Sequence, residues 1–172
     1  AVNDDSIEAV SKLINNSNAI ILHTSGSVSI DALTNNTNFG VLYPLQTITK
    51  NEEIDFSKIP VLIEGNSEAT LNKIKELAES ISQNVAEMSS DKRKSTHLAA
   101  VVSNNFTNYL LTFVRAYCEK ESIDFDLLQP LIQKTISETN PQTGPAKRGD
   151  INTINEHLSM LNENPELKDL YE

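Results

Sequence analysis

The fold is decided by the stretch Ala19-Ile20-Ile21-Leu22 and by the turn that follows it, His23-Thr24-Ser25-Gly26. An unbroken apolar run of this kind is typical of a strand that is buried on both faces of a parallel sheet. Open α/β sheets bind their ligands beyond the carboxyl ends of the strands. The turn therefore occupies the position of a ligand site, and its hydroxyls, imidazole and backbone donors suit a polar ligand. A strand-ending turn with a polar cap explains the same residues equally well.

The segments on both sides of this stretch extend an α/β pattern. An amphipathic helix is predicted before it, over residues 6–14, with Asp4 or Asp5 as its cap. Alternating strand and helix patterns follow it, over residues 39–43 (strand), 61–64 (strand), 67–82 (helix) and 85–88 (strand). Residues 1–89 are therefore predicted to form one α/β domain.

From Asp91 onward the pattern is helical only, which predicts a domain boundary near Ser89-Ser90 and an all-α domain over residues 90–172. The first of these helices is long and is apolar over much of its circumference. Such a helix needs cover on several sides, so we expect it at the centre of a bundle that a second subunit partly covers. Shorter helices are predicted over 126–139, over 153–161 and from Pro165.

Composition excludes several classes of partner. The chain of 172 residues carries 24 acidic and 14 basic side chains, a net charge of −10, and no basic stripe with interleaved aromatics, so nucleic acid is not expected as a partner. No apolar run is long enough to span a bilayer. The single cysteine, Cys118, lies in an apolar helix and has no disulfide partner, which indicates a cytoplasmic protein. The three histidines have no Glu or Cys at metal-ligand spacing, and no metal is expected.

The five glycines are too far apart to form the G-x-G-x-x-G turn that holds a pyrophosphate. An intact dinucleotide-binding motif is therefore absent from this sequence. Gly144 and Gly149 have P-loop spacing, but Asp150-Ile151 follows them in place of Lys-Ser/Thr and no strand precedes them. The sequence thus contains no P-loop.

Polar residues gather on the long helix. At about 100° per residue, Asn104 and Asn108 fall on the same side as His97, with Asn105 beside them. Amides and an imidazole on an otherwise apolar helix are costly to bury unless they bind something. The cluster is therefore a candidate site, although a lone helical histidine is more often structural.

A loop over residues 143–150 concentrates two glycines, a proline and two cations. Arg148 in such a loop can bind a carboxylate or phosphate with both of its terminal nitrogens. The same loop also reads as a helix-to-helix connection in which Asp150 caps the next helix, and both interpretations can hold.

The order of these motifs resembles one family: the NAD(P)-dependent oxidoreductases with a Rossmann-like N-terminal domain and a C-terminal helical domain of unknown function (domain of unknown function 2520). That helical domain is similar to the dimerising domains of the 6-phosphogluconate dehydrogenase and pyrroline-5-carboxylate reductase group. The resemblance covers essentially the whole chain. It is carried by His23-Thr24-Ser25-Gly26, Gly40 to Thr47, Lys94 to Ala100, Asn105-Phe106-Thr107-Asn108, Gln142 to Arg148 and His157-Leu158.

The resemblance implies the second half of a Rossmann-like domain followed by a helical dimerisation domain. It implies hydride transfer between NADP or NAD and a small, acidic metabolite in a homodimer, with the main pyrophosphate site and the N-terminal nucleotide-binding half missing from this chain. His97 and Asn105 look like the catalytic residues, and His97 is the candidate acid or base because imidazole is suited to proton transfer near neutral pH. The cofactor-binding residues would be His23, Thr24, Ser25 and Gly26, and the substrate-binding residues Pro44, Gln46, Asn104, Asn108, Thr143 and Arg148.

Two features depart from the family pattern. The glycine-rich half is lacking, and the stretch from Ser137 to Gln142 is shorter than is usual in the family. A competing hypothesis is therefore a non-catalytic dimerisation or ligand-binding module that keeps the fold without the chemistry. A glycine-rich strand-turn-helix upstream would favour the enzyme.

Overall fold

The computed structural model describes residues 2–14, 18–49, 53–138 and 142–172. The chain divides into two compact units, Ala1–Ser103 and Asn104–Glu172. The first unit combines a four-stranded sheet with helices, and the second is helical, which confirms the predicted α/β fold followed by helices. The boundary predicted near residue 89 rests on a change of sequence pattern and stays a prediction.

The sheet of the first unit has the order β1-β2-β3-β4. Strands β1 and β2 are parallel, β2 and β3 antiparallel, and β3 and β4 parallel, so the sheet is mixed. Its strand boundaries lie within one residue of those predicted. The elements of this unit are η1 (Asp4–Ser6), α1 (Ile7–Ser11), β1 (Ile20–His23), η2 (Ile30–Leu33), β2 (Asn38–Pro44), η3 (Phe56–Lys58), β3 (Val61–Gly65), α2 (Glu68–Ile81), β4 (Val85–Glu87) and α3 (Ser90–Ala100).

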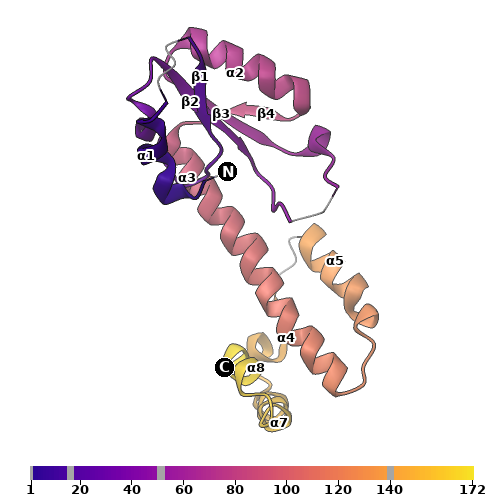
Figure 1. Ribbon diagram of the computed structural model, residues 1–172. Coiled ribbons are helices and arrows are strands. Elements are labelled where there is room, and N and C mark those ends of the chain that lie inside the picture. Colours follow the sequence, from indigo (N-terminus) through magenta and orange to yellow (C-terminus); the bar gives the residue numbers. More distant parts are fainter. Residues whose placement is uncertain (1, 15–17, 50–52, 139–141) are drawn as a thin grey trace. The chain divides into compact units, whose positions relative to one another are not determined.

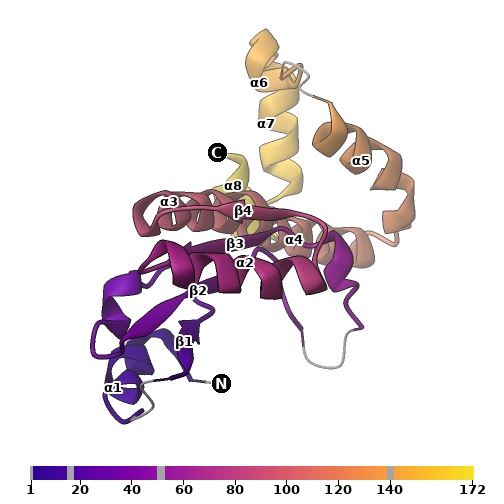
Figure 2. The ribbon, with the colours of Figure 1, turned by 90° about the horizontal axis from the view of Figure 1, so that it is seen from above.

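Helix α2 covers one face of this sheet, and α3 begins on the other (Figures 1 and 2). The core between α2 and the sheet contains Leu42, Ile63 and Ile74, and Leu22 packs against it. Because successive side chains of a strand point to opposite faces, the residues that follow these in β1, β2 and β3 face away from α2. Those residues are His23, Tyr43 and Glu64.

Gly40 in β2 permits the close packing of α2 on this sheet. A Cβ atom at Gly40 would overlap the Glu64 carbonyl oxygen and Cδ1 of Ile74. The start of α2 is fixed by Ser67, whose hydroxyl accepts the Thr70 backbone N–H at 3.2 Å. The sheet and its covering helix are therefore held in one arrangement.

Helix α1 differs from its prediction. It ends at Ser11, short of residue 14, and neither Asp4 nor Asp5 caps it with a side-chain hydrogen bond. The Asp4 carboxylate instead accepts hydrogen bonds from the Ser25 and Ser27 hydroxyls, which follow β1. The Asp4 carboxylate, which the local pattern assigned to the cap of this helix, thus binds residues that are distant in the sequence.

The second unit has little core of its own. Among its described residues only Cys118 and Leu161 are buried, whereas many large apolar side chains are exposed. The burial of Cys118 agrees with its prediction. The helical elements from residue 101 onward are η4 (Val101–Phe106, a π-helix that contains the division between the units), α4 (Thr107–Lys120), η5 (Phe125–Leu128), α5 (Gln129–Ser137), α6 (Pro145–Arg148), α7 (Ile151–Met160) and α8 (Pro165–Tyr171).

In the described part of the chain, every helix is too short or too polar to cross a lipid bilayer. The shortened stretch 137–142 cannot be compared with its prediction as a whole, because residues 139–141 lie outside the described ranges.

Candidate functional site

The turn after β1 is closed by its own hydroxyl groups. Ser25 Oγ accepts the backbone N–H groups of Ser27 and Val28, both at 3.1 Å, and donates to the Asp4 carboxylate at 2.7 Å. Ser27 Oγ donates to the same carboxylate at 2.6 Å. Hydrogen bonds from Ser27 and Ser25 lower the pKa of Asp4, so that its carboxylate is charged at neutral pH. The turn therefore carries a fixed negative charge at one end.

His23 is buried at the base of this turn, with 6% of its surface exposed. Its Nδ1 accepts the Ser25 N–H at 3.2 Å. Burial, and after it the positive charge of Arg93, lowers the pKa of His23. The ring is therefore neutral at physiological pH and carries its proton on Nε2. That Nε2 is buried and has no described partner in good hydrogen-bond geometry, although the Ser29 backbone interacts with the ring and partly offsets the lowering of its pKa.

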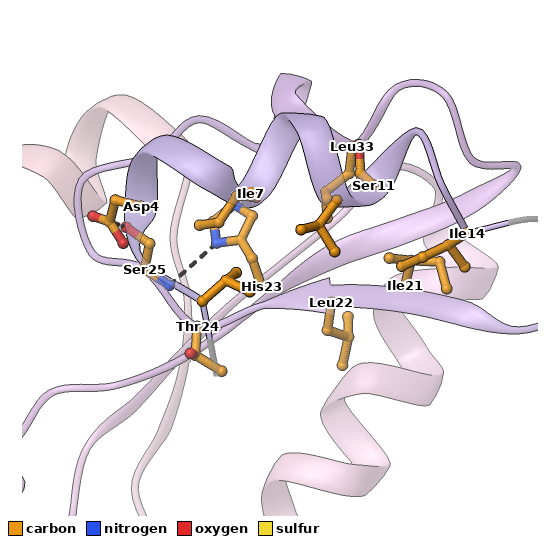
Figure 3. Close-up of a pocket in the computed structure, with 12 residues that line it drawn as sticks. Asp4, Ile7, Ser11, Ile14, Ile21, Leu22, His23, Thr24, Ser25 and Leu33 are labelled. Atoms are coloured by element: carbon orange, nitrogen blue, oxygen red, sulfur yellow. Dashed lines mark hydrogen bonds between the residues drawn. The ribbon is translucent and has the colours of Figure 1, made fainter.

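A cavity of about 250 Å³ lies between α1 and β1 (Figure 3). His23 points from β1 toward α1, while Thr24 points to the other side of the strand (Figure 3). Ser25 also lines the cavity, and most of the remaining lining is aliphatic. No Lys or Arg lies among the described residues that line it. The cavity therefore suits an uncharged, flat group better than a phosphate.

On the same face of the sheet, Tyr43 contacts His97. The Tyr43 hydroxyl lies 3.0 Å from Nδ1 of His97, and the two rings meet edge to face with centroids 5.9 Å apart. Burial, with a smaller effect of the Asp4 charge, raises the pKa of Tyr43, so that it stays a neutral phenol. The turn packs directly on this pair at Gly26, where a Cβ atom would lie 2.6 Å from His97 Nδ1 and 2.8 Å from Tyr43 Cζ.

A buried ion pair anchors the helix that carries His97. Arg93 is fully buried and donates to the Glu64 carboxylate in β3 and to the Val28 carbonyl in the turn. The Ser90 backbone N–H and hydroxyl donate to the same carboxylate at 2.9 and 2.7 Å. Because His97 follows Arg93 by four residues, the two lie on one side of α3. The ion pair thus fixes the position of His97 relative to β3 and the turn.

The sequence did not single out Tyr43, Glu64 or Arg93 as site residues. Tyr43 and Glu64 could be placed on the site face from the alternation of their strands. No sequence signal joins them to His97 and Arg93, because the partners are far apart along the chain and meet only when α3 packs on the sheet.

Two predicted substrate residues lie at the end of β2 and after it. Pro44 is the last residue of β2 and pairs with Val61 in β3. Gln46 is exposed, and its side-chain oxygen accepts the Thr47 N–H at 3.2 Å. Pro44 directly follows Tyr43 in the chain, and no described hydrogen bond joins Pro44 or Gln46 to His97; their binding role stays a prediction.

The predicted asparagines lie in the second unit and are exposed. The Asn104 amide donates to Asn105 Oδ1 at 3.0 Å. Residues 101–106 form a π-helix, which turns less per residue than an α-helix. The rotation argument that grouped Asn104 and Asn108 with His97 therefore does not hold, and their roles rest on the resemblance alone.

Arg148 is engaged within its own loop. It donates to the Thr143 carbonyl and forms an ion pair with Asp150 at 2.7 Å. Asp150 precedes α7 but forms no side-chain cap with it, because its carboxylate is taken by Arg148. An anionic ligand would have to compete with Asp150 for this guanidinium.

Across the described ranges, no three His, Cys, Asp or Glu residues gather as a metal site.

Acidification is expected to destabilise the first unit through His23. The pKa of His23 in the folded protein lies below its value in the unfolded chain. Between about pH 7 and pH 5 the unfolded chain therefore binds the proton first, and the free energy of unfolding decreases as the pH is lowered. Urea unfolding at a series of pH values measures this slope. His23→Gln should flatten it and His157→Gln should not; an unchanged slope in His23→Gln contradicts the assignment.

The chain is similar to several known proteins. Residues 59–172 match a family model described as a domain of unknown function (DUF2520). The crystal structure of a "putative NADP oxidoreductase" from Bacteroides fragilis is 35% identical, with a TM-score of 0.87 over 99% of this chain and 70% of that one. A protein from Thermotoga maritima is 24% identical, with a TM-score of 0.71 over 99% of this chain and 71% of that one, and shows the fold alone. No curated protein matches the chain significantly. The fold is therefore that of an NAD(P)-oxidoreductase-like protein.

Proposed function

The chain belongs to the DUF2520 family, and from this premise we propose that it acts in NAD(P)-dependent hydride transfer to or from a small, acidic metabolite. The observation that carries the proposal is the gathering of His23, Tyr43 and His97 beside the carboxyl ends of the parallel strands β1 and β2, in a chain that resembles an NADP oxidoreductase. His23 lines the cavity between α1 and β1, while Tyr43 and His97 lie beside the turn at Gly26. The resemblance in sequence motifs also implied His23 and His97 as site residues.

The residues around the turn suit the nicotinamide end of a cofactor. An aliphatic cavity can hold a neutral ring, and Nε2–H of His23 can donate to a carboxamide oxygen. Thr24, Ser25 and Gly26 would contribute backbone groups, because the Ser25 hydroxyl is engaged with Asp4 and the Thr24 side chain points to the other side of the strand. The Asp4 carboxylate would repel a phosphate here, so the pyrophosphate must bind elsewhere. The described cavity therefore fits only part of NADPH.

Bound NADPH would supply the hydride that reduces the carbon of a C=O bond. His97, as an imidazolium, would give its Nε2 proton to the carbonyl oxygen and would regain a proton from the solvent, so that one substrate, one NADPH and one proton are consumed and an alcohol and NADP⁺ are formed. We assign His97 the role of general acid or base and Asn105 that of its companion, with Arg148 and Thr143 as ligands of an acidic substrate group.

Titration with NADPH and NADH tests this function. The intact natural protein should quench or shift the fluorescence of at least one reduced nucleotide in a saturable manner. His23→Phe, which fills the space beside the turn and removes the donor, should weaken this binding by about tenfold, the effect of one lost hydrogen bond. His157→Phe is the matched control in the second unit. Absence of binding to both nucleotides would contradict the oxidoreductase and favour a non-catalytic module.

That module is the second candidate function. It is favoured by two observations: the given sequence contains no glycine-rich turn, and no Lys or Arg lines the described cavity. It would keep the fold and the helical unit and bind an uncharged ligand or a partner. Ligand binding without any nucleotide binding in the titration above would support it.

We also propose that the protein is a homodimer assembled through its helical unit. With Cys118 and Leu161 as its only buried residues among those described, this unit buries too little apolar surface to be stable by itself. Large apolar side chains remain exposed on α4, α5, α7 and α8, among them Tyr109, Leu110, Leu131, Ile136, Ile151, Met160 and Leu170. A second copy presents the same apolar surface, and two such surfaces can cover each other.

Leu131→Asp is expected to weaken the dimer. Leu131 is 65% exposed in the single chain. Two copies of a buried leucine, each contributing about 1.5–3 kcal/mol, would be lost per dimer, which raises the dissociation constant by at least about a hundredfold. Light scattering after size-exclusion chromatography measures the change. Gln133→Asp adds the same charge at an exposed polar position of α5 and should leave the dimer intact; a monomeric wild-type protein contradicts the proposal.

A further inference from the structure

Tyr43 is the described residue that touches His97 most directly, and neither the family motifs nor the predicted site assigned it a role. We propose that Tyr43 is a positioning residue for His97: its phenol oxygen accepts the Nδ1–H and keeps Nε2 as the nitrogen that exchanges a proton with the reacting group. The inference rests on the proposed function and adds the residue that sets the tautomer of its acid or base.

The direction of the hydrogen bond follows from the role assigned to His97. A ring that gives its catalytic proton from Nε2 must keep a proton on Nδ1 when it becomes neutral, because a neutral imidazole carries one proton. Tyr43 stays a neutral phenol, because burial and the Asp4 charge both oppose its ionisation. Its oxygen lies 3.0 Å from Nδ1 of His97 and can accept the Nδ1–H. Nε2, the ring nitrogen away from Tyr43, is then the one that gains and loses the catalytic proton.

The contact is held from three sides. Tyr43 lies in β2, where it pairs with Leu62 of the neighbouring strand, and so cannot shift along the sheet. His97 is carried by α3, whose start is fixed by the Arg93 and Glu64 ion pair. Gly26 closes the third side, because any larger residue would collide with both rings. The fold therefore presents one arrangement of the pair.

Other charged and titratable groups near the pair do not replace Tyr43. Asp4 interacts with both rings through its charge, but its carboxylate is occupied by Ser25 and Ser27. His23 accepts from Ser25, and Arg93 is bound to Glu64. Among the described residues, Tyr43 is thus the one with a hydrogen bond to the His97 imidazole.

The chain contains a matched control for this contact. His157 and Tyr171, both in the second unit, form an equivalent pair, with Nδ1 and the phenol oxygen 2.6 Å apart and the rings edge to face. Tyr171→Phe removes the same kind of hydrogen bond at a distance from the proposed chemistry along the chain. It separates the specific effect of Tyr43 from the general effect of losing a phenol.

The test is the tautomer of His97, read by ¹⁵N imidazole correlation spectroscopy of the full chain at about pH 8, above the ordinary titration of histidine. We expect a protonated, hydrogen-bonded Nδ1 and an unprotonated Nε2 in the wild type. In Tyr43→Phe the Nδ1 proton loses its acceptor and the ring should shift toward the Nε2–H tautomer, whereas Tyr171→Phe should move only His157. A proton on Nε2 in the wild type, or a His97 spectrum that Tyr43→Phe leaves unchanged, overturns the proposal.

Catalysis gives a second readout. Tyr43→Phe should lower kcat by about tenfold, the effect of one lost hydrogen bond, with no change in NADPH affinity. Adding Tyr43→Phe to His97→Ala should lower kcat no further, since Tyr43 acts through His97. Additive losses would overturn the positioning role. Failure to bind NADPH with the expected tautomer intact would overturn the proposed function and leave the Tyr43 contact in place, so the two failures are distinguishable.

Discussion

Arg93→Ala is expected to lower the free energy of unfolding by about 3–5 kcal/mol, the usual cost of removing one partner from a buried ion pair. The Glu64 carboxylate would lose its charged partner while keeping only the hydrogen bonds from Ser90. The Val28 carbonyl would also lose its donor, which loosens the turn. Urea unfolding followed by circular dichroism measures the change.

The matched control is an exposed ion pair. Lys75 and Glu87 lie 3.6 Å apart with about half of each side chain exposed, and Lys75→Ala should cost no more than about 1 kcal/mol. Replacing both members of the buried pair, as in Arg93→Met with Glu64→Leu, should recover much of the loss, because no charge is then left buried. A cost below 1 kcal/mol for Arg93→Ala would show that the ion pair does not anchor α3.

His97→Ala is expected to reduce turnover by about 10²- to 10⁴-fold, the range typical of losing a general acid or base. NADPH affinity should be unchanged, because the residues assigned to the cofactor lie in the turn. Stopped-flow measurement of nucleotide oxidation with a substrate found by screening carbonyl compounds gives both quantities.

His157→Ala removes a histidine with a similar tyrosine partner and serves as the control. It should leave turnover within a few-fold of wild type. Equal losses in His97→Ala and His157→Ala would indicate a general effect on the fold, and unchanged turnover in His97→Ala would remove its catalytic role.

The strands could be predicted because their signal is local. Short strand-like runs that end in Pro44 or Gly65 place β2 and β3 within one residue of their observed ends. Ser67 marks the start of α2 for the same reason, since a cap and its helix are adjacent in the chain. The short helix α6 was missed because Pro145–Arg148 contains too few residues to show a periodic pattern.

The site could be predicted only in part. The turn at residues 23–26 and His97 were selected from the sequence, but the antiparallel pairing of β3 was not. Asp4 was assigned to a helix cap because it is adjacent to that helix, whereas the fold brings it to Ser25 and Ser27. The π-helix at 101–106 has no distinct periodic signal in the sequence, so the rotation that placed the asparagines beside His97 was wrong.

The sequence by itself determined the order of strands and helices, the polar turn after β1, and the abundance of acidic over basic charge. The elements and the turn depend on neighbouring residues, and the excess of acidic charge is a count over the composition. Only the tertiary structure decided that Tyr43 faces His97 over Gly26 and that Arg93 binds Glu64. Such pairs are set by which faces of the sheet and of α3 meet, and the free energy of that packing depends on residues far apart along the chain.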